Sequence, residues 1–555
     1  MVDEDKKTSE GLSAEKKYNT AVEEASDYIE HFDILETITN VGNDEVFTPR
    51  KTADMMLDSL PDEVWHNPNY KWLNPATKNG IFEREIAIRL DEGLKDVIPD
   101  KETRRKHILQ NMVFSIGLTK FTANVARRTV YYCSEANRAC DGIKAPDGHF
   151  VNGYAIGNGT WFSDTEGNIK TPNTSHEIDP KTKKCKYCGV AHDSKYLDAN
   201  QREQYAYEFM HVNHLVIERH LRNRFFKGDK NMKFDIIIGN PPYQLSTNDS
   251  GIQATPIYHK FVEQAISLSP KYISMIIPSR WFTGGMGMDL FREKMLNDKR
   301  MALLVDFPKS RDCFPNVDIA GGVCYFLWDS EHQGKCQVVS SVGGKTTSKN
   351  RLLNDFDVFI RSNIGIGIID KIRAKTKVFL DRLVYPISPF GLPTNTRGEE
   401  KPFDNSIKVI ASAGEFYIKK DSLPKGADII DKYKVSIGQL NPDRGGVNNA
   451  SDGMSNVTTK IKIYKPGEAF TATYLLLGAF DTEQEANNYA SYIKTKFARY
   501  LVLLTLSSMH ITKDNFKFVP NLTYEKSWSD KELYEMYGLD ETEIKDIESL
   551  IREMI

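Results

Sequence analysis

The sequence has few cysteines, no long apolar run and no excess of positive charge. Seven cysteines in 555 residues are typical of a reducing compartment and argue against a disulfide framework. No run of about 18 apolar residues occurs, so we expect no membrane span. The charged stretch over residues 1–17 lacks the pattern of a secretory signal. We therefore expect a cytoplasmic protein with no membrane partner.

The formal net charge of −3 gives no general support for binding to nucleic acid. Basic residues do cluster locally, at residues 104–107 and 219–227, but such clusters are more often solvated helix faces than DNA contacts. A chain of this length exceeds what one hydrophobic core sustains and should divide into two or three domains. Because neither the charge nor the length of the chain indicates a function, conclusions about function must come from motifs.

Short apolar runs alternate with amphipathic helical stretches between about residues 45 and 330. Strands that are apolar throughout and separated by helices predict an α/β fold with a mostly parallel sheet that is buried on both faces. The expected strands cover residues 112–116, 234–238, 272–277, 302–306 and 322–328, with helices over 255–268 and 288–296.

Changes in this pattern suggest how the chain is divided. Residues 1–40 form a helical lead-in, and the α/β domain covers residues 41–335. An insertion at 133–195 is rich in Gly, Asn, Asp, Thr and Lys and holds four of the seven cysteines. Residues 336–525 mix strands and helices, which predicts a second, α+β domain. Residues 526–555 should form a pair of helices, because Ser529 and Glu532 have the spacing of a capping box.

An apolar strand runs directly into the turn Asn240-Pro241-Pro242-Tyr243. Ligands of open α/β sheets bind beyond the carboxyl ends of the strands, where this turn should lie. The side-chain oxygen of Asn240 and the carbonyl oxygen of Pro241 are two acceptors suited to the two N–H groups of an exocyclic amine. The prolines restrict φ and hold both oxygens in place. Tyr243 offers a ring on which an extruded base can stack. The alternative is a structural proline turn after a strand.

This segment resembles motif IV of amino-group methyltransferases, and the chain resembles the gamma-class N6-adenine DNA methyltransferases of restriction–modification systems from about residue 30 onward. The resemblance implies a Rossmann-like class I methyltransferase sheet, S-adenosylmethionine as cofactor, and double-stranded DNA as partner. It implies a flipped-out adenine as the methyl acceptor and a target-recognition domain at 336–525. It leaves open a separate restriction endonuclease or helicase subunit.

Two further segments resemble cofactor motifs of that family. Residues 47–49, followed by a helical stretch, resemble motif X. Residues 72–82 resemble motif I, in which backbone N–H groups of a tight turn approach the cofactor's carboxylate. Glycine at position 80 permits this close approach. The cofactor-binding residues implied are Phe47, Thr48, Pro49, Asn74, Pro75, Ala76, Thr77, Gly80, Gly117, Thr119 and Asn213.

The cofactor motifs depart from the family pattern at three positions. Asn74 replaces an acid, and Lys78 replaces a glycine; Lys78 either pairs with the cofactor's carboxylate or simply tolerates the turn. Gly117 stands where the family has an acid that binds the ribose hydroxyls. The loss of such charged hydrogen bonds costs about 1.5–3 kcal/mol each unless another group replaces them. Thr119 is one substitute, and Asn213 falls where a contact to the adenine ring is expected.

Two later segments also resemble parts of the pocket. Residues 278–282 resemble a motif at a strand end that lines it. Phe314 is a candidate for the second face of the flipped base, with core packing as the alternative.

The insertion contains Cys185-Lys-Tyr-Cys188-Gly189, which has the form of a zinc knuckle. Cys133 together with His176 or Cys140 can complete four ligands. We favour His176, because the stretch between it and Cys185 can form a hairpin. Four protein ligands make a structural zinc site. The alternative is a redox pair, which would need the N-terminus of a helix.

The second domain has two candidate DNA-contacting regions: the loop 441–446, with Arg444, and the basic residues Lys494, Lys496 and Arg499 on one expected helix. Three other hypotheses compete with the DNA methyltransferase. One is a methyltransferase for RNA or for glutamine side chains, which the long second domain disfavours. Another is a DNA-binding specificity subunit with lost or partner-dependent catalysis. A fused nuclease is disfavoured, because the acid-x-Lys run Glu543-Ile-Lys545 lies in an expected helix.

Overall fold

The computed structural model describes residues 46–131, 135–137, 161–191, 206–245, 255–285, 287–315, 317–443, 453–506 and 510–554. The expected helical lead-in at 1–40 lies outside these residues. The chain divides into two compact units, Met1–Gln337 and Val338–Ile555, and each is described by itself. Among the described residues, no helix has both the length and the apolar character needed to cross a bilayer.

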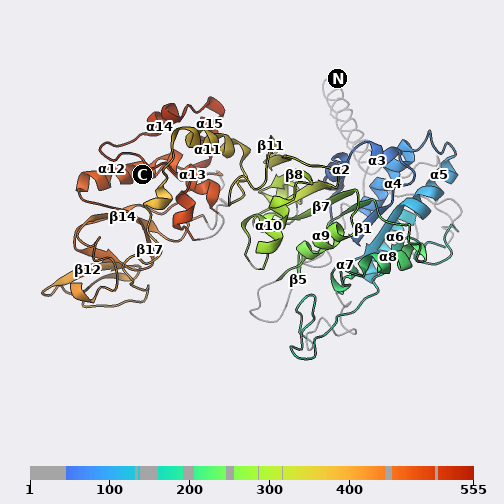
Figure 1. The fold of residues 1–555 in the computed structure, drawn as a ribbon, viewed down its shortest axis with the longest axis horizontal. Helices are drawn as coiled ribbons and strands as arrows, with labels where there is room; N and C mark the ends of the chain where they lie inside the picture. Colours follow the sequence, from blue (N-terminus) through green and yellow to red (C-terminus); the bar gives the residue numbers. More distant parts are fainter. Residues whose placement is uncertain are drawn as a thin grey trace, which may run out of the picture. The chain divides into compact units, whose positions relative to one another are not determined.

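The first unit contains the predicted parallel sheet, whose elements are labelled in Figure 1. Its strands lie in the order β8, β9, β7, β4, β1, β2, β3. Strands β1, β2, β3, β4 and β7 pair in parallel, and β9 runs antiparallel between β7 and β8. The strands are β1 (Trp72–Thr77), β2 (Val113–Gly117), β3 (Ile169–Lys170), β4 (Ile236–Gly239), β7 (Tyr272–Pro278), β8 (Met301–Phe307) and β9 (Val323–Asp329).

Helices connect these strands and cover the sheet. Helix α4 packs with α2, α3, α5 and α6, whereas α9 packs with α7 and with β7. All residues of β1, β4 and β7 are buried, as expected of strands that are covered on both faces. The helices are α2 (Arg50–Asp58), α3 (Glu63–His66), α4 (Ile81–Gly93), α5 (Lys101–His107), α6 (Lys120–Tyr131), α7 (Glu208–His211), α8 (Ile217–Phe226), α9 (Tyr258–Ser267) and α10 (Asp289–Asn297).

The five strands expected from the sequence correspond to β2, β4, β7, β8 and β9, within two residues at each end. The prediction of a mixed α/β fold with a large, mostly parallel sheet is therefore confirmed. The insertion contributes β3, which pairs with β2 at the edge of the sheet, and the short strands β5 (Gln244–Leu245) and β6 (Thr255–Pro256) pair with each other after β4.

The second unit is α+β and has two hydrophobic cores. One core includes residues of α11 to α15, and the other surrounds β12, β13 and β16. Its strands are β10 (Cys336–Val342), β11 (Lys345–Arg351), β12 (Ser406–Ala411), β13 (Gly414–Lys419), β14 (Tyr433–Gly438), β15 (Lys462–Tyr464), β16 (Glu468–Phe470) and β17 (Tyr474–Phe480). Its helices are α11 (Asn363–Lys375), α12 (Glu483–Lys494), α13 (Lys496–Thr505), α14 (Asp530–Tyr537) and α15 (Glu541–Leu550).

The C-terminal helices α14 and α15 form as the sequence predicts. Ser529 and Glu532 make the expected capping box at the start of α14. Leu533, Tyr537 and Ile547 are buried in the same core as α11, α12 and α13. Residues 526–555 thus share a hydrophobic core with the helices that precede them.

Candidate functional site

The turn after β1 brings three distant segments of the chain together. A small cavity is lined by Thr48 from the start of the described chain, by the turn and first residues of α4, and by Asn240 after β4. Six of the residues predicted from the sequence line it: Thr48, Asn74, Ala76, Thr77, Gly80 and Asn240. The carboxyl ends of neighbouring parallel strands meet at one edge of a sheet, which explains this convergence.

Gly80 has the conformation that the turn requires. Its φ is +80°, and a Cβ atom there would lie 2.9 Å from the Cα atom of Ala126 in α6. Asn79 beside it is 2% exposed. Its Oδ1 accepts a hydrogen bond from the backbone N–H of Ile81, and its buried Nδ2 has no partner among the described residues. The turn therefore presents an unused hydrogen-bond donor beside the start of a helix, where anions bind favourably.

The side chain of Asn240 is held in one orientation. Its Nδ2 donates hydrogen bonds to the carbonyl oxygen of Val46 and to Oγ1 of Thr48, each 3.1 Å away. Its Oδ1 is buried and has no hydrogen-bond partner within the described chain. Because both amide hydrogens are engaged, the group that Asn240 leaves available is an acceptor.

Lys78 lines the same cavity. Its Nζ donates a hydrogen bond of 2.8 Å to the carbonyl oxygen of Val46, and the side chain is 5% exposed. That oxygen thus accepts from both Lys78 and Asn240. Neither role proposed for Lys78 from the sequence included this contact with the backbone of Val46.

Glu83, in the first turn of α4, also lines the cavity. Its Oε1 accepts a hydrogen bond from Nδ2 of Asn74 at 3.0 Å, and Oδ1 of Asn74 accepts from the backbone N–H of Ala76 at 3.1 Å. Burial raises the pKa of the Glu83 carboxyl, although hydrogen bonds oppose this shift. The sequence analysis missed Glu83, because a glutamate early in a helix looks like an ordinary helix-start residue.

Tyr243 and Phe314 differ in how they are placed. Tyr243 is half-buried, while its hydroxyl is enclosed without a partner among the described side chains and backbone. Burial raises the pKa of this hydroxyl well above its ordinary value. Phe314 is 1% exposed. Pro241 and Pro242 are buried at the end of β4.

The remaining candidates for cofactor binding do not line the cavity. Phe47 is buried, Pro49 precedes the first residue of α2, and Pro75 lies within β1. The hydroxyl of Thr119 contacts that of Thr122 at 3.1 Å, at the start of α6. Asn213 is exposed, and its Oδ1 accepts from the backbone N–H of Leu215.

The structure gives a physical reason for glycine at position 117. A Cβ atom there would lie 2.5 Å from the Cβ atom of Ala123, and 2.9 Å from the backbone of that residue. No side chain fits at Gly117 unless α6 moves, so the acid of the family pattern has no place here.

The structure also describes Cys185 and Cys188, the cysteine pair of the insertion. Cys185, Cys188 and His176 lie together, as predicted, and they are joined by His211 at the end of α7. Cys133 and Cys140 lie outside the described residues. Burial lowers the pKa of His211 to about 3 and raises that of Cys188 to about 12. No helix begins at the cysteine pair, which disfavours the redox alternative.

The prediction that Lys494, Lys496 and Arg499 share one helix is wrong. Lys494 ends α12 and Lys496 begins α13, because the side chain of Thr495 caps the second helix. Arg499 is 2% exposed, and its Nε donates to the carbonyl oxygen of Lys494, so it does not present a charge to DNA. In the loop 441–446, Asn441 is buried, and Arg444 lies outside the described residues.

The basic clusters of the first unit form internal ion pairs. Arg104 and Arg105 both pair with Asp91. Arg224 pairs with Glu208, and Arg222 pairs with Glu218. These four arginines therefore form ion pairs within the first unit, and Arg104 is buried rather than part of a solvated helix face.

Comparison with known proteins identifies the family. Residues 111–314 match the family described as "Eco57I restriction-modification methylase". A protein of Mycoplasma pneumoniae (strain ATCC 29342 / M129 / Subtype 1) described as "Uncharacterized adenine-specific methylase" is 44% identical over 359 residues. The match covers 61% of this chain and 82% of that protein. The chain belongs to the adenine-specific methylases of restriction–modification type.

Solved structures resemble this methylase at low sequence identity. The type IIG restriction endonuclease BpuSI is 11% identical, with a TM-score of 0.40, and the match covers 91% of this chain and 61% of that chain. The type IIL restriction-modification enzyme MmeI, solved in complex with DNA, is 9% identical, with a TM-score of 0.38, over 84% of this chain and 65% of that chain. The methylase therefore spans less than two thirds of the length of either enzyme.

Proposed function

We propose that this methylase transfers a methyl group from S-adenosylmethionine to the N6 amine of an adenine in duplex DNA, within a restriction–modification system. The observation that carries the proposal is the orientation of Asn240. Its two amide hydrogens are engaged by Val46 and Thr48, and its Oδ1 is left as a buried acceptor without a partner among the described residues. An exocyclic amine is the complementary donor.

The chain's own residues can activate this amine without a strong base. The nitrogen of an aromatic amine is a poor nucleophile, because its lone pair is delocalised into the ring. One N–H of the amine donates to Oδ1 of Asn240, and the other donates to the carbonyl oxygen of Pro241. Together these two hydrogen bonds favour a pyramidal nitrogen with a localised lone pair. The buried prolines fix these acceptors before the substrate arrives, so little reorganisation is needed during the reaction. Once the new N–C bond has formed, the amine nitrogen would carry a positive charge and would release one proton to solvent.

S-adenosylmethionine supplies an electrophilic methyl group when it is bound. The residues around the turn after β1 suit its amino-acid end. Nδ2 of Asn79 is a buried donor without a partner in the described structure, and it lines the cavity with Thr77 and Gly80. The start of α4 adds backbone N–H groups that favour a carboxylate. The ribose contact differs from the family pattern, because Gly117 cannot carry an acid; Thr119 and Asn213 stay predictions for that part of the cofactor.

We also propose that the target adenine is flipped out of the duplex and stacks on Tyr243. An adenine amine inside a duplex is paired and cannot reach a buried acceptor, so extrusion is required. The half-buried ring of Tyr243 follows Asn240 by three residues, with its hydroxyl enclosed. Phe314, at 1% exposed, serves as the second face only if the segment around it moves when the base enters.

Three further expectations also stay proposals. The second unit is our candidate for the target-recognition domain, and a separate restriction endonuclease or helicase subunit is a candidate partner. The zinc knuckle of the insertion is supported by the grouping of Cys185, Cys188 and His176.

The decisive experiment is methylation of mixed-sequence duplex DNA, followed by digestion and mass spectrometry of the nucleosides. The parent protein should produce N6-methyladenine, and the Asn240→Ala variant should produce less by a factor of about 100 or more, as when one acceptor or donor of a preorganised site is removed. The exposed Asn231→Ala variant is the matched control. Absence of any methylated base, with DNA binding retained, would instead support the specificity subunit with lost or partner-dependent catalysis.

A further inference from the structure

Four side chains with metal-binding atoms converge between the insertion and α7. His176, Cys185, Cys188 and His211 each offer one ligand atom, and these atoms all lie within 4.8 Å of one another. Sγ of Cys188 is 3.4 Å from Nδ1 of His176. Zinc bonds of about 2.3 Å to sulfur and about 2.0–2.1 Å to nitrogen place the corners of a tetrahedron about 3.3–3.8 Å apart. The cluster thus needs only a small contraction to surround one ion.

The backbone around the two cysteines has the form that a knuckle requires. The N–H of Gly189 donates to the carbonyl oxygen of Cys185 at 2.9 Å, and Gly189 has a φ of +76°. The N–H of Cys185 donates to the carbonyl oxygen of Val190. An antiparallel bridge joins Ile178 to Cys185. This hairpin holds Cys185 near His176, as a shared site requires.

The ring of His211 is oriented as a ligand. Its Nδ1 lies 3.1 Å from the carbonyl oxygen of Tyr207, to which it can donate. Its Nε2 is buried and has no partner among the described residues. A histidine that donates one ring N–H to a backbone carbonyl directs the lone pair of its other nitrogen, and metal-binding histidines are commonly held this way. In His176, Nδ1 lies 3.4 Å from Sγ of Cys188, and Nε2 is enclosed without a partner in the described structure.

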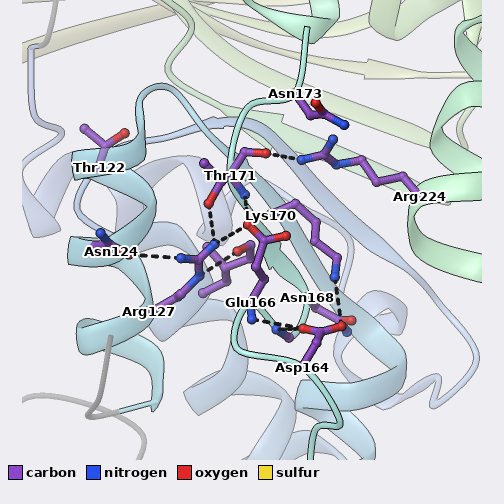
Figure 2. Close-up of polar contacts among 12 residues, drawn as sticks. Thr122, Asn124, Arg127, Asp164, Glu166, Asn168, Lys170, Thr171, Asn173 and Arg224 are labelled. Carbon is purple, nitrogen blue, oxygen red and sulfur yellow. Dashed lines mark hydrogen bonds and ion pairs between the residues drawn. The ribbon is translucent and has the colours of Figure 1, made fainter. Parts of the chain in front are cut away.

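Independent contacts hold residues 166–171, which precede His176 in the chain, against α6. Figure 2 shows Arg127 of α6 among Asn124, Glu166 and Thr171, with Arg224 beside Thr171. The guanidinium of Arg127 donates to Glu166 at 2.9 Å and to Thr171 at 2.7 Å.

Glu208 links the same segment to α7. Its carboxylate accepts from the backbone N–H of Asn173 at 2.9 Å and pairs with Arg224. Since Glu208 and His211 lie on the same short helix, the contact with Asn173 also places His211 beside His176.

We propose that His176, Cys185, Cys188 and His211 bind one zinc ion, which fastens the knuckle to α7, and that His211 takes the position expected for Cys133. Two thiolates and two imidazoles in a buried cluster are a donor set typical of zinc. The protein supplies all four ligands, so the ion is structural. Its binding does not depend on methyl transfer, and the two proposals are tested separately.

Helix α9, which follows the Asn240 turn and β6 in the chain, contacts both segments that carry the proposed ligands. Nζ of Lys260 in α9 donates to the carbonyl oxygen of Tyr187, between the two cysteines. Nε2 of Gln264 in α9 donates at 3.0 Å to the carbonyl oxygen of Val212, next to His211. The metal therefore stabilises both segments that pack on this face of α9.

The first test is the metal content of the full-length protein, measured by mass spectrometry after dialysis against a weak chelator. We expect about one zinc ion per chain in the parent protein and less than about 0.2 in His211→Ala, because a closed four-ligand site loses most of its affinity with one ligand. His214→Ala, an exposed histidine three residues on, and Cys133→Ser should each keep about one ion. Retention of zinc by His211→Ala with loss from Cys133→Ser would overturn the assignment, as would a parent protein that takes up no zinc.

A second test does not depend on how well His211→Ala folds. His211→Cys supplies a different zinc ligand at the same position and should keep about one ion. Replacement of zinc by cobalt should give the visible absorption of a tetrahedral site, and the sulfur-to-metal band should strengthen in His211→Cys, because three thiolates replace two. An unchanged spectrum in that variant would show that position 211 does not bind the metal.

Discussion

Nδ2 of Asn240 lies 3.1 Å from the carbonyl oxygen of Val46, and these two residues are 194 positions apart in the sequence. This hydrogen bond joins the residue just before the segment that resembles motif X to the segment that resembles motif IV. It determines which end of the Asn240 amide is available to a substrate. The residues just before α2 thus orient the side chain of Asn240 in the turn after β4.

Thr48 should contribute to this orientation. Thr48→Val keeps the shape of the side chain but removes the hydroxyl that accepts from Nδ2 of Asn240. The loss of one hydrogen bond of about 0.5–1.5 kcal/mol predicts a fall in the single-turnover methylation rate of about 2- to 13-fold. DNA affinity should not change, and Thr542→Val, an exposed threonine of α15, should retain the full rate. An unchanged rate in Thr48→Val would show that Val46 alone orients the amide.

Lys78 offers a test between two roles. Lys78→Met removes the hydrogen bond to the carbonyl oxygen of Val46, and we expect kcat to fall about tenfold with KM for S-adenosylmethionine nearly unchanged, since this contact positions Asn240. A lysine that pairs with the cofactor's carboxylate would give the opposite result, a higher KM with kcat preserved. Steady-state kinetics over a range of cofactor concentrations separates the two, with the exposed Lys95→Met as control.

These contacts show how far the sequence alone could lead. The sheet was predictable, because strands such as β4 and β7 are apolar throughout and are bounded by helices and turns. The turn at Asn240 was predictable too, because two prolines after a buried strand leave few conformations. The orientation of Asn240 was not, since it depends on a backbone carbonyl distant in sequence, and no side-chain pattern reports the position of a carbonyl.

One wrong prediction and one residue that the sequence analysis did not consider have similarly local causes. Lys494 and Arg499 were expected on one helix, but Thr495 between them is a capping residue that starts a new one, and a threonine within an otherwise helical pattern is an ambiguous signal. His211 was not recognised as a candidate metal ligand, because it lies outside the cysteine-rich insertion. Tertiary contacts such as that of Glu208 with Asn173 bring the two segments together.

Restoring the acid of the family pattern at position 117 should fail. In Gly117→Asp, the new Cβ atom would meet Ala123 at 2.5 Å, and such overpacking costs about 1–3 kcal/mol of folding free energy. We expect a lower melting temperature and no gain in affinity for S-adenosylmethionine, measured by calorimetry. Gly334→Asp is the control, since the nearest atom to a Cβ there is 3.9 Å away. Tighter cofactor binding by Gly117→Asp would show that α6 yields to the side chain.

The buried carboxyl of Glu83 predicts how stability depends on pH. Burial raises its pKa above the ordinary value of 4.5, so between the two pKa values the folded state binds more protons than the unfolded state. The stability that Glu83 contributes is therefore present in full below about pH 4.5 and is lost as the pH rises through the folded-state pKa. Glu83→Gln keeps Oε1 as an acceptor for Asn74 and does not titrate. Relative to the parent protein, this variant should become progressively more stable as the pH rises above about 4.5, as urea denaturation would measure. The exposed Glu92→Gln variant should show no such trend, and a constant difference for Glu83→Gln would mean that the carboxyl is ionised in the folded protein throughout this range.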